Sequence, residues 1–215
     1  LTISIEGITP DVHNTIRRTP KLFENLIKGI EEVKKYRGDK KVPKIKIRTV
    51  VNKEMYDSMG EYIEFWKDKV DEVVMQPIHS FDLHKLKVPE ELRFNKEDQE
   101  KFIRVFGELQ EKYPFLRRTY YDEFKNFFFD PKKVREKYKC YAGYYMMHVN
   151  PDGKVYPCTS CVKYLGNLHE SSFKDIWKGV EAQAFRKVIR NNENTCFCWY
   201  NCSGTFSSAF DPVLG

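Results

Sequence analysis

The first 139 residues of this 215-residue chain contain no cysteine, and all six cysteines lie between Cys140 and Cys202. Random scatter would not produce this distribution, so the cysteines share a role. The sequence also lacks an apolar run approaching the roughly 20 residues of a membrane span, and it shows no charged-then-apolar leader. We therefore expect a cytoplasmic protein without membrane contact, in which stabilising disulfides are disfavoured.

The composition is that of a folded chain with a core. Hydrophobic residues make up 41% and aromatic residues 15% of the sequence. The net charge of +6 is spread through alternating lysines and glutamates, without a basic block. This pattern indicates a solvated surface with at most a mild attraction for anions, so nucleic acid is not excluded as a partner.

The first 77 residues alternate between strand and helix patterns. Strands are expected at 2–7, 44–51 and 70–76, and helices at 20–38 and 54–67, with residues 8–19 as a loop. On the second strand, Ile45, Ile47 and Thr49 share one face. This order predicts a parallel α/β sheet whose working residues lie at the carboxyl ends of the strands.

The next 60 residues carry weaker signals. Asn95 is expected to cap a helix that runs to about Tyr113. Residues 124–129 are aromatic and are expected to pack between the α/β part and the cysteine region.

The cysteine region predicts a β-hairpin followed by a helix. Asn150-Pro151-Asp152-Gly153 is typical of a turn, and its flanking arms bring Cys140 and Cys158 together. A helix capped by Ser172 and Asp175 follows, and we expect its apolar side chains to pack inward: Phe173, Ile176, Trp177 and Val180. Cys196, Cys198 and Cys202 then complete the site. Gathered thiolates hold either zinc or an iron-sulfur cluster.

This region resembles the SPASM domain, which follows the barrel of radical S-adenosylmethionine (radical SAM) enzymes. Cys140 and Cys158 enclose Gly153 at the spacing with which the SPASM motif opens. Leu165-Gly166-Asn167-Leu168 and the segment from Ser172 to Trp177 resemble its continuation. The end departs from the full motif, because only Cys196, Cys198 and Cys202 remain.

That cysteine count supports one cluster, as in the shortened "twitch" variant. The resemblance implies that Cys140, Cys158, Cys198 and Cys202 bind an auxiliary 4Fe-4S cluster. Cys196 is the alternative ligand. Cys161 is the least favoured, because it lies in the linker before Leu165.

Residues 1–77 resemble the rear of a radical SAM partial barrel. The segments Ile3 to Gly7 and Lys46 to Asn52 are similar to two of its strands. The resemblance implies that Ser4, Glu6 and Asn52 face S-adenosylmethionine or substrate, although strand ends are polar in most α/β folds. The family's Cys-x3-Cys-x2-Cys motif is absent, and Leu1 opens in a strand pattern, so we expect a fragment.

The resulting domain prediction is a rear half-barrel at 1–80, a helical linker at 81–139 and a SPASM/twitch module at 140–205. The resemblance implies a parent enzyme with a second 4Fe-4S cluster that reductively cleaves S-adenosylmethionine, so that a hydrogen is abstracted from a peptide or small-molecule substrate. An electron donor such as ferredoxin or flavodoxin is implied as a partner. The fragment alone is expected to be inactive.

The competing hypothesis is a non-catalytic zinc module with four cysteine ligands, which contacts nucleic acid or a protein partner. The sequence does not separate electron relay from structural bracing by the cluster, and it does not identify the substrate.

Overall fold

The computed structural model describes residues 1–78, 89–191, 193 and 198–200. They form two compact units. The first contains residues 1–78 and 91–116, and the second contains residues 89–90 and the described residues from 117 onward. In the described part of the chain, no helix is both long and apolar enough to cross a membrane.

The first unit is built on a parallel three-stranded sheet with the order β1-β2-β3. The strands are β1 (Thr2–Ser4), β2 (Lys46–Val51) and β3 (Glu72–Pro77). Ile3 pairs with Ile47, which in turn pairs with Val73. The predicted parallel α/β sheet is thus confirmed.

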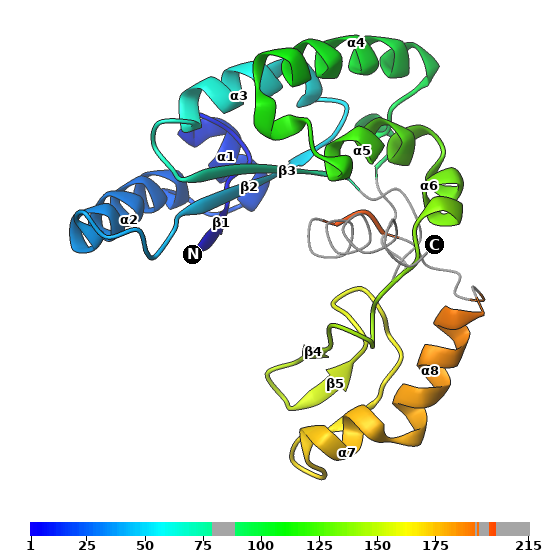
Figure 1. Ribbon diagram of the computed structural model, residues 1–215. Helices are drawn as coiled ribbons and strands as arrows, with labels where there is room; N and C mark the ends of the chain where they lie inside the picture. The colour runs from blue at the N-terminus through cyan, green and yellow to red at the C-terminus, as the bar shows by residue number, and fades with distance from the viewer. Residues whose placement is uncertain (79–88, 192, 194–197, 201–215) are drawn as a thin grey trace. The chain divides into compact units, whose positions relative to one another are not determined.

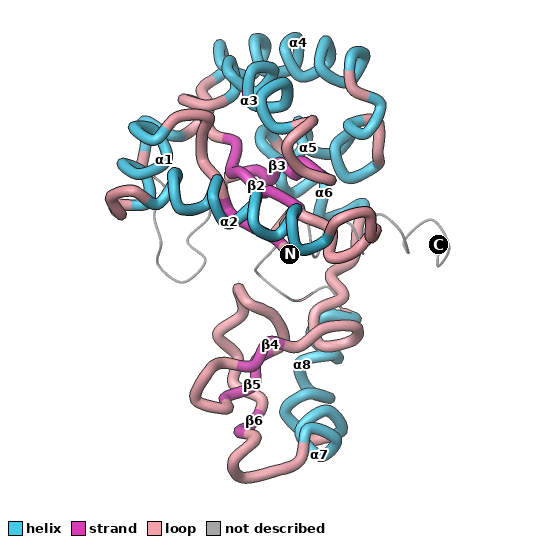
Figure 2. The backbone as a smooth tube through the Cα atoms, turned by 90° about the vertical axis from the view of Figure 1, so that its left-hand side faces the viewer, coloured by secondary structure: helices cyan, strands magenta, loops and turns pink. Residues whose placement is uncertain are grey.

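Helices cover this sheet. They are α1 (Pro10–Arg17), α2 (Leu22–Arg37), α3 (Met59–Trp66) and α4 (Lys96–Lys112). Short 3-10 turns precede α3 and α4, namely η1 (Tyr56–Ser58) and η3 (Glu90–Leu92), and η4 (Pro114–Leu116) follows α4. Figure 1 and Figure 2 both show α3 and α4 side by side. Asn95 and Asp98 form a capping box at the start of α4, which confirms the predicted cap.

The core of the first unit follows the expected strand periodicity. Ile47 is fully buried and Thr49 is 1% exposed, so the predicted inward face of β2 is confirmed. Trp66 of α3 is fully buried and meets Phe23 of α2 edge to face at 6.0 Å between ring centroids. Aromatic pairs of this geometry add to the stabilisation from buried area.

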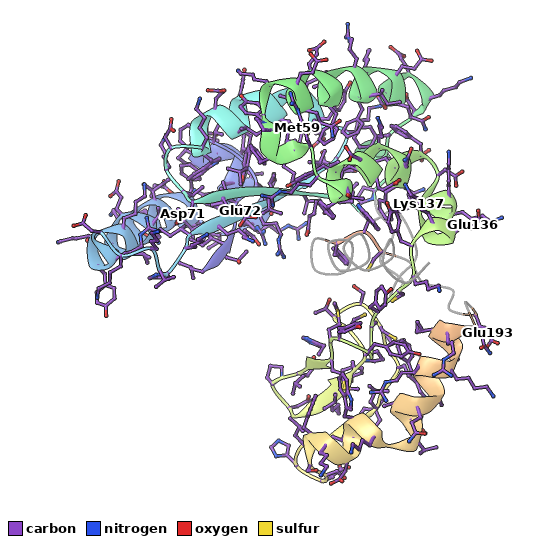
Figure 3. The ribbon with its side chains drawn as sticks, in the orientation of Figure 1. Met59, Asp71, Glu72, Glu136, Lys137 and Glu193 are labelled. Atoms are coloured by element: carbon purple, nitrogen blue, oxygen red, sulfur yellow. The ribbon has the colours of Figure 1, made fainter. Side chains whose placement is uncertain are left out.

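Asp71 ties together the amino ends of β2 and β3. Its Oδ2 accepts a hydrogen bond from the Ile45 backbone N–H at 2.6 Å and one from Arg37 Nη1 at 2.5 Å. The Ile45 N–H lowers the pKa of Asp71 most, while its burial opposes this effect. Asp71 directly precedes Glu72, the first residue of β3, and both are labelled in Figure 3.

The prediction of a loop over residues 8–19 is wrong, because α1 lies there. The Thr9 side chain accepts a hydrogen bond from the Val12 N–H, and Pro10 occupies the first turn. The negative charge of Asp11 interacts favourably with the positive, N-terminal end of the helix dipole. Arg18 ends the helix in the left-handed conformation, with φ of 51°. The next helix begins at Leu22, two residues after the predicted start.

The second unit contains α5 (Thr119–Phe129), α6 (Pro131–Lys137) and a small antiparallel sheet with the order β4-β5-β6. Its strands are β4 (His148–Val149), β5 (Lys154–Tyr156) and β6 (Gly166–Asn167). The first two form the predicted hairpin. Figure 2 shows β6 next to β5, a third strand that the sequence pattern did not predict.

Two helices, α7 (Phe173–Lys178) and α8 (Val180–Arg190), follow the sheet. The Ser172 hydroxyl accepts a hydrogen bond from the Asp175 N–H at 3.2 Å, as the predicted cap requires. The prediction that Phe173 and Val180 pack inward is wrong, because they are 47% and 77% exposed. Gly179 ends one helix and precedes the next, so a single helical period does not run through both residues.

Candidate cysteine site and strand-end cavity

Three of the cysteines lie against one hydrophobic cluster in the second unit. Cys140, Cys158 and Cys161 are partly buried and pack against its members. The buried residues of the cluster are Ala142, Val155, Leu165, Ile176, Ala182, Phe185 and Ile189. The two predicted hairpin ligands therefore share one apolar environment.

The hairpin brings its two ends together as expected. The Asn150 N–H donates to the Lys154 carbonyl at 2.9 Å, and Gly153 turns the chain with φ of +80°. Beyond the arms, a Cβ added to Gly143 would lie 3.9 Å from the Pro157 Cβ. Gly143 is three residues after Cys140, and Pro157 directly precedes Cys158. The two segments that carry these cysteines are thus close neighbours.

Cys198 is held near the segment that carries Cys140 by its neighbour in the sequence, Trp199. The Trp199 ring lies 5.0 Å from the Tyr138 ring, centroid to centroid. Tyr138 precedes Cys140 by two residues, a span of at most roughly 7 Å of extended chain. The C-terminal cysteine segment therefore meets the chain that leads into the hairpin.

The remaining two predicted ligands, Cys196 and Cys202, lie outside the described residues. Within the described ranges, no three His, Cys, Asp or Glu side chains are grouped closely enough to hold a metal ion. The predicted four-cysteine site, which leaves out Cys161, includes at least one of those two residues. Its completion stays a prediction.

Cys161 occupies the turn after Cys158, and its N–H donates to the Cys158 carbonyl at 3.4 Å. Burial raises the pKa of the Cys161 thiol, and a hydrogen bond with the Lys163 backbone opposes that effect. An apolar surrounding disfavours the thiolate form that binds metals. Cys140 and Cys158 pack against the same cluster, so this environment by itself does not separate Cys161 from the predicted ligands.

The donor chemistry fits an iron-sulfur cluster. Cys140, Cys158 and Cys198 carry sulfur donors, the donor type common to iron-sulfur clusters and soft metals. The apolar cluster limits access of water to two of them. Such a surrounding tunes the potential of a bound cluster.

The first unit has a cavity of about 710 Å³ at the carboxyl ends of β1 and β2. Its lining is mainly apolar, from Ile8, Val12, Ile16, Val50 and Met55, with Glu6, Arg17, Asn52, Glu54 and Glu61 as charged or polar members. Ligands of α/β proteins bind at this end of the strands. The sequence pattern located the strand ends but not the cavity.

Glu6 is the most constrained polar group in the cavity wall. Its Oε2 accepts hydrogen bonds from the Thr49 hydroxyl and the Val50 N–H, both at 3.2 Å. Its Oε1 pairs with the Arg17 guanidinium. The carboxylate thus joins β1, β2 and α1, and it turns Arg17 toward the strand ends.

The other two predicted residues differ in their placement. Asn52 lines the cavity, but its Oδ1 accepts from the Glu54 N–H at 2.8 Å and the Met55 N–H at 3.1 Å. This side chain therefore also caps the turn into η1. Ser4 is exposed at the end of β1 and is not part of the cavity lining.

His13, a residue to which the sequence pattern gives no role, is fully buried. Its Nδ1 accepts a hydrogen bond from the Glu6 N–H at 3.0 Å, whereas Nε2 has no partner among the described residues. Burial lowers the pKa of His13 most, followed by the Arg17 charge, while Glu6 raises it. A neutral imidazole therefore supports the Glu6 backbone.

Residues 140–203 match the SPASM family, described as an iron-sulfur cluster-binding domain. The AdoMet-dependent heme synthase of Methanosarcina barkeri (strain Fusaro / DSM 804) is 26% identical over 234 residues, which cover 98% of this chain and 63% of the synthase. The chain is a radical SAM-related protein with a C-terminal SPASM domain. It spans less than two thirds of the synthase.

Solved structures show the same fold around and before the SPASM domain. Native anSMEcpe with bound AdoMet and Cp18Cys peptide has a TM-score of 0.58 at 19% identity, covering 91% of this chain and 54% of that chain. SuiB of Streptococcus suis has a TM-score of 0.55 at 16% identity, covering 86% and 45%. The described α/β unit and SPASM domain therefore correspond to about half of these proteins.

Proposed function

We propose that Cys140, Cys158, Cys198 and Cys202 bind one auxiliary 4Fe-4S cluster in the SPASM domain. The observation that carries this assignment is the meeting of two distant segments: Trp199, next to Cys198, packs on Tyr138, close to Cys140. The hairpin adds Cys158 to the same hydrophobic cluster as Cys140. Cys202 follows Cys198 by four residues, and Cys196 is the alternative to either of them.

In this arrangement, four thiolates would satisfy the cluster fully, without an open position for substrate. A bound cluster would supply electron transfer or a structural brace. The residues of the domain would hold it in apolar surroundings, and the Ser172 cap and Gly179 would fix the helices behind the hairpin.

We also propose that the strand-end cavity serves the cofactor or substrate side of a radical SAM reaction. The anSMEcpe structure named above contains both bound AdoMet and a peptide. In this chain, Glu6 and Arg17 would provide the charged contacts, Asn52 an amide, and the apolar wall would exclude water. Ser4, at the end of the same strand, is kept as a further candidate contact.

The parent reaction in this proposal is radical hydrogen abstraction from a peptide or small molecule. S-adenosylmethionine, bound together with a second 4Fe-4S cluster, would supply the radical chemistry. An electron donor such as ferredoxin or flavodoxin would act with the whole enzyme in the cytoplasm. The described residues of this chain would position ligands and shield them from water.

The direct test is anaerobic reconstitution of the full chain with iron and sulfide. We expect a brown protein that absorbs near roughly 400 nm, in the usual range of thiolate-to-iron charge transfer. Cys→Ala changes at Cys140, Cys158, Cys198 and Cys202 should each remove most of the bound iron.

Cys161→Ala is the matched control, because Cys161 lies in the same hydrophobic cluster and should leave the iron content unchanged. A colourless protein with stoichiometric zinc would contradict the cluster and favour the zinc module. Loss of iron on changing Cys161 but not Cys158 would contradict the ligand assignment.

A further inference from the structure

Trp199 lies between two residues of the C-terminal segment, Cys198 and Tyr200, and it is fully buried. A tryptophan buries roughly 150–250 Å² of surface, the largest contribution that one side chain can make. The proposed role of this segment is to supply thiolate ligands, but the Trp199 side chain is not itself a ligand. Its burial needs an explanation in terms of packing.

Two tyrosines enclose the indole. The Tyr120 ring stacks on it with a centroid distance of 5.8 Å and an interplanar angle of 7°. The Tyr138 ring lies 5.0 Å away at an angle of 47°. One tyrosine comes from α5 and the other directly follows α6, so both helices contribute to the pocket.

Hydrogen bonds fix the register of the segment. Trp199 Nε1 donates to the Tyr120 carbonyl at 2.8 Å, and the Tyr120 hydroxyl donates to the Trp199 carbonyl at 3.2 Å. Because a buried indole N–H without a partner is costly, this reciprocal pair favours one placement of the ring. A shift by one residue would break both bonds.

The pocket is itself anchored by a buried carboxylate. The Tyr138 hydroxyl donates to Glu123 Oε1 at 3.1 Å, and Asn126 Nδ2 donates to Glu123 Oε2 at 2.7 Å. Lys137, on α6 in Figure 3, pairs with the same carboxylate. Glu123 is only 4% exposed. These contacts use no cysteine, so the pocket does not need a metal in order to form.

We propose that Trp199 is a positioning residue that docks the C-terminal cysteine segment beside Cys140 before any metal is bound. This inference rests on the proposed function, since it assigns to Trp199 the assembly of that same thiolate site. It predicts that part of the site is already in place in the metal-free protein. Metal then completes the site without having to gather the two segments.

The test uses fluorine NMR of the full metal-free chain labelled with 5-fluorotryptophan. The chain has three tryptophans, so the Trp199 signal is assigned as the one lost in Trp199→Phe. We expect this signal to be shifted from the unfolded position and to show no shift between H2O and D2O, as a buried ring requires. An unfolded position with a full solvent shift would overturn the proposal.

A second measurement uses Co²⁺ as a thiolate probe. Partners beyond the ligands typically change metal affinity by about 10–100-fold, and we expect a loss in this range for Trp199→Ala. Trp177→Ala is the control, because Trp177 is half-buried in the same unit and stacks on Arg186 at 4.7 Å. Equal losses in both variants would overturn the specific role of Trp199.

These measurements also separate this inference from the proposed function. If the native metal proves to be zinc, the iron-sulfur assignment fails, whereas a buried Trp199 in the metal-free chain still supports the docking role. If iron and sulfide bind but Trp199 is exposed without them, the docking role fails and the cluster assignment stands.

Discussion

The first unit buries aliphatic strands of up to six residues under long helices, whereas the strands of the second unit are two or three residues long. Fully buried side chains such as Ile47 and Trp66 hold the first unit together. In the second unit, a small apolar cluster lies against Cys140, Cys158 and Cys161, and an aromatic stack holds Trp199 next to Cys198. From this comparison we expect hydrophobic burial to suffice for the first unit and the proposed cluster to add stability to the second.

Metal removal should have the largest effect on local stability, and this effect should differ most clearly between the two units. Metal binding to the folded state alone stabilises that state by mass action, so a chelator should weaken the second unit. We expect amide exchange in β4, β5 and α8 to accelerate at least tenfold, with β2 and α3 unchanged. Hydrogen exchange with mass spectrometry measures both units in one sample.

Cys158→Ala should reproduce the effect of the chelator, whereas Cys161→Ala should not. Equal acceleration of exchange in both units would contradict the division into a metal-independent and a metal-dependent part.

Two glycines offer an intermediate test. A Cβ on Gly153, where φ is +80°, would lie 2.6 Å from Asn167 Oδ1, so Gly153→Ala should destabilise the second unit by about 1–3 kcal/mol. Gly29 lies in α2 with no atom within 4 Å of an added Cβ. Gly29→Ala should therefore stabilise the first unit by about 0.5–1 kcal/mol.

Urea unfolding of each glycine variant, followed by exchange of peptides from each unit, gives both free energies. If Gly29→Ala changed the free energy of unfolding of the second unit as much as that of the first, this would contradict the view that the two units are stabilised separately.

The sequence predicts most of the fold but misses some elements, and both outcomes have physical causes. Strand alternation placed Ile47 and Thr49 correctly, because burial on one face repeats every two residues. The loop prediction at 8–19 overlooked the cap formed by Thr9 and Pro10, a local signal that was present. The outward positions of Phe173 and Val180 depend on a helix break at Gly179, which periodicity alone does not locate.

The candidate site divides in the same way. The turn at Gly153 predicted the approach of Cys140 to Cys158, because a hairpin fixes the distance between its ends. The cavity around Glu6 and the buried His13 could not be predicted, since both depend on contacts between β1, β2 and α1. The pocket for Trp199 likewise joins residues 79 positions apart.

The smallest effect should come from His13 in the first unit. Its pKa is lowered below the ordinary 6.5, so the unfolded chain binds a proton more readily than the folded chain. The contribution of His13 to the free energy of unfolding should therefore be fully present well above pH 6.5 and decline as the pH falls below this value. The slope should correspond to the uptake of less than one proton on unfolding. His13→Asn can keep an acceptor for the Glu6 N–H, and should remove this slope.

Thermal unfolding of the His13→Asn variant and the natural chain between about pH 5 and 8 gives the two slopes. Identical slopes would exclude His13 as their source and leave the first unit without this pH-sensitive contact.

The central claim is that the cysteines of the second unit bind iron and sulfide together. Its most direct test is the amount of iron and acid-labile sulfide per chain after anaerobic preparation. We predict about four of each for the natural chain and for Cys161→Ala, and close to none for Cys158→Ala. One zinc per chain with no sulfide would contradict the claim.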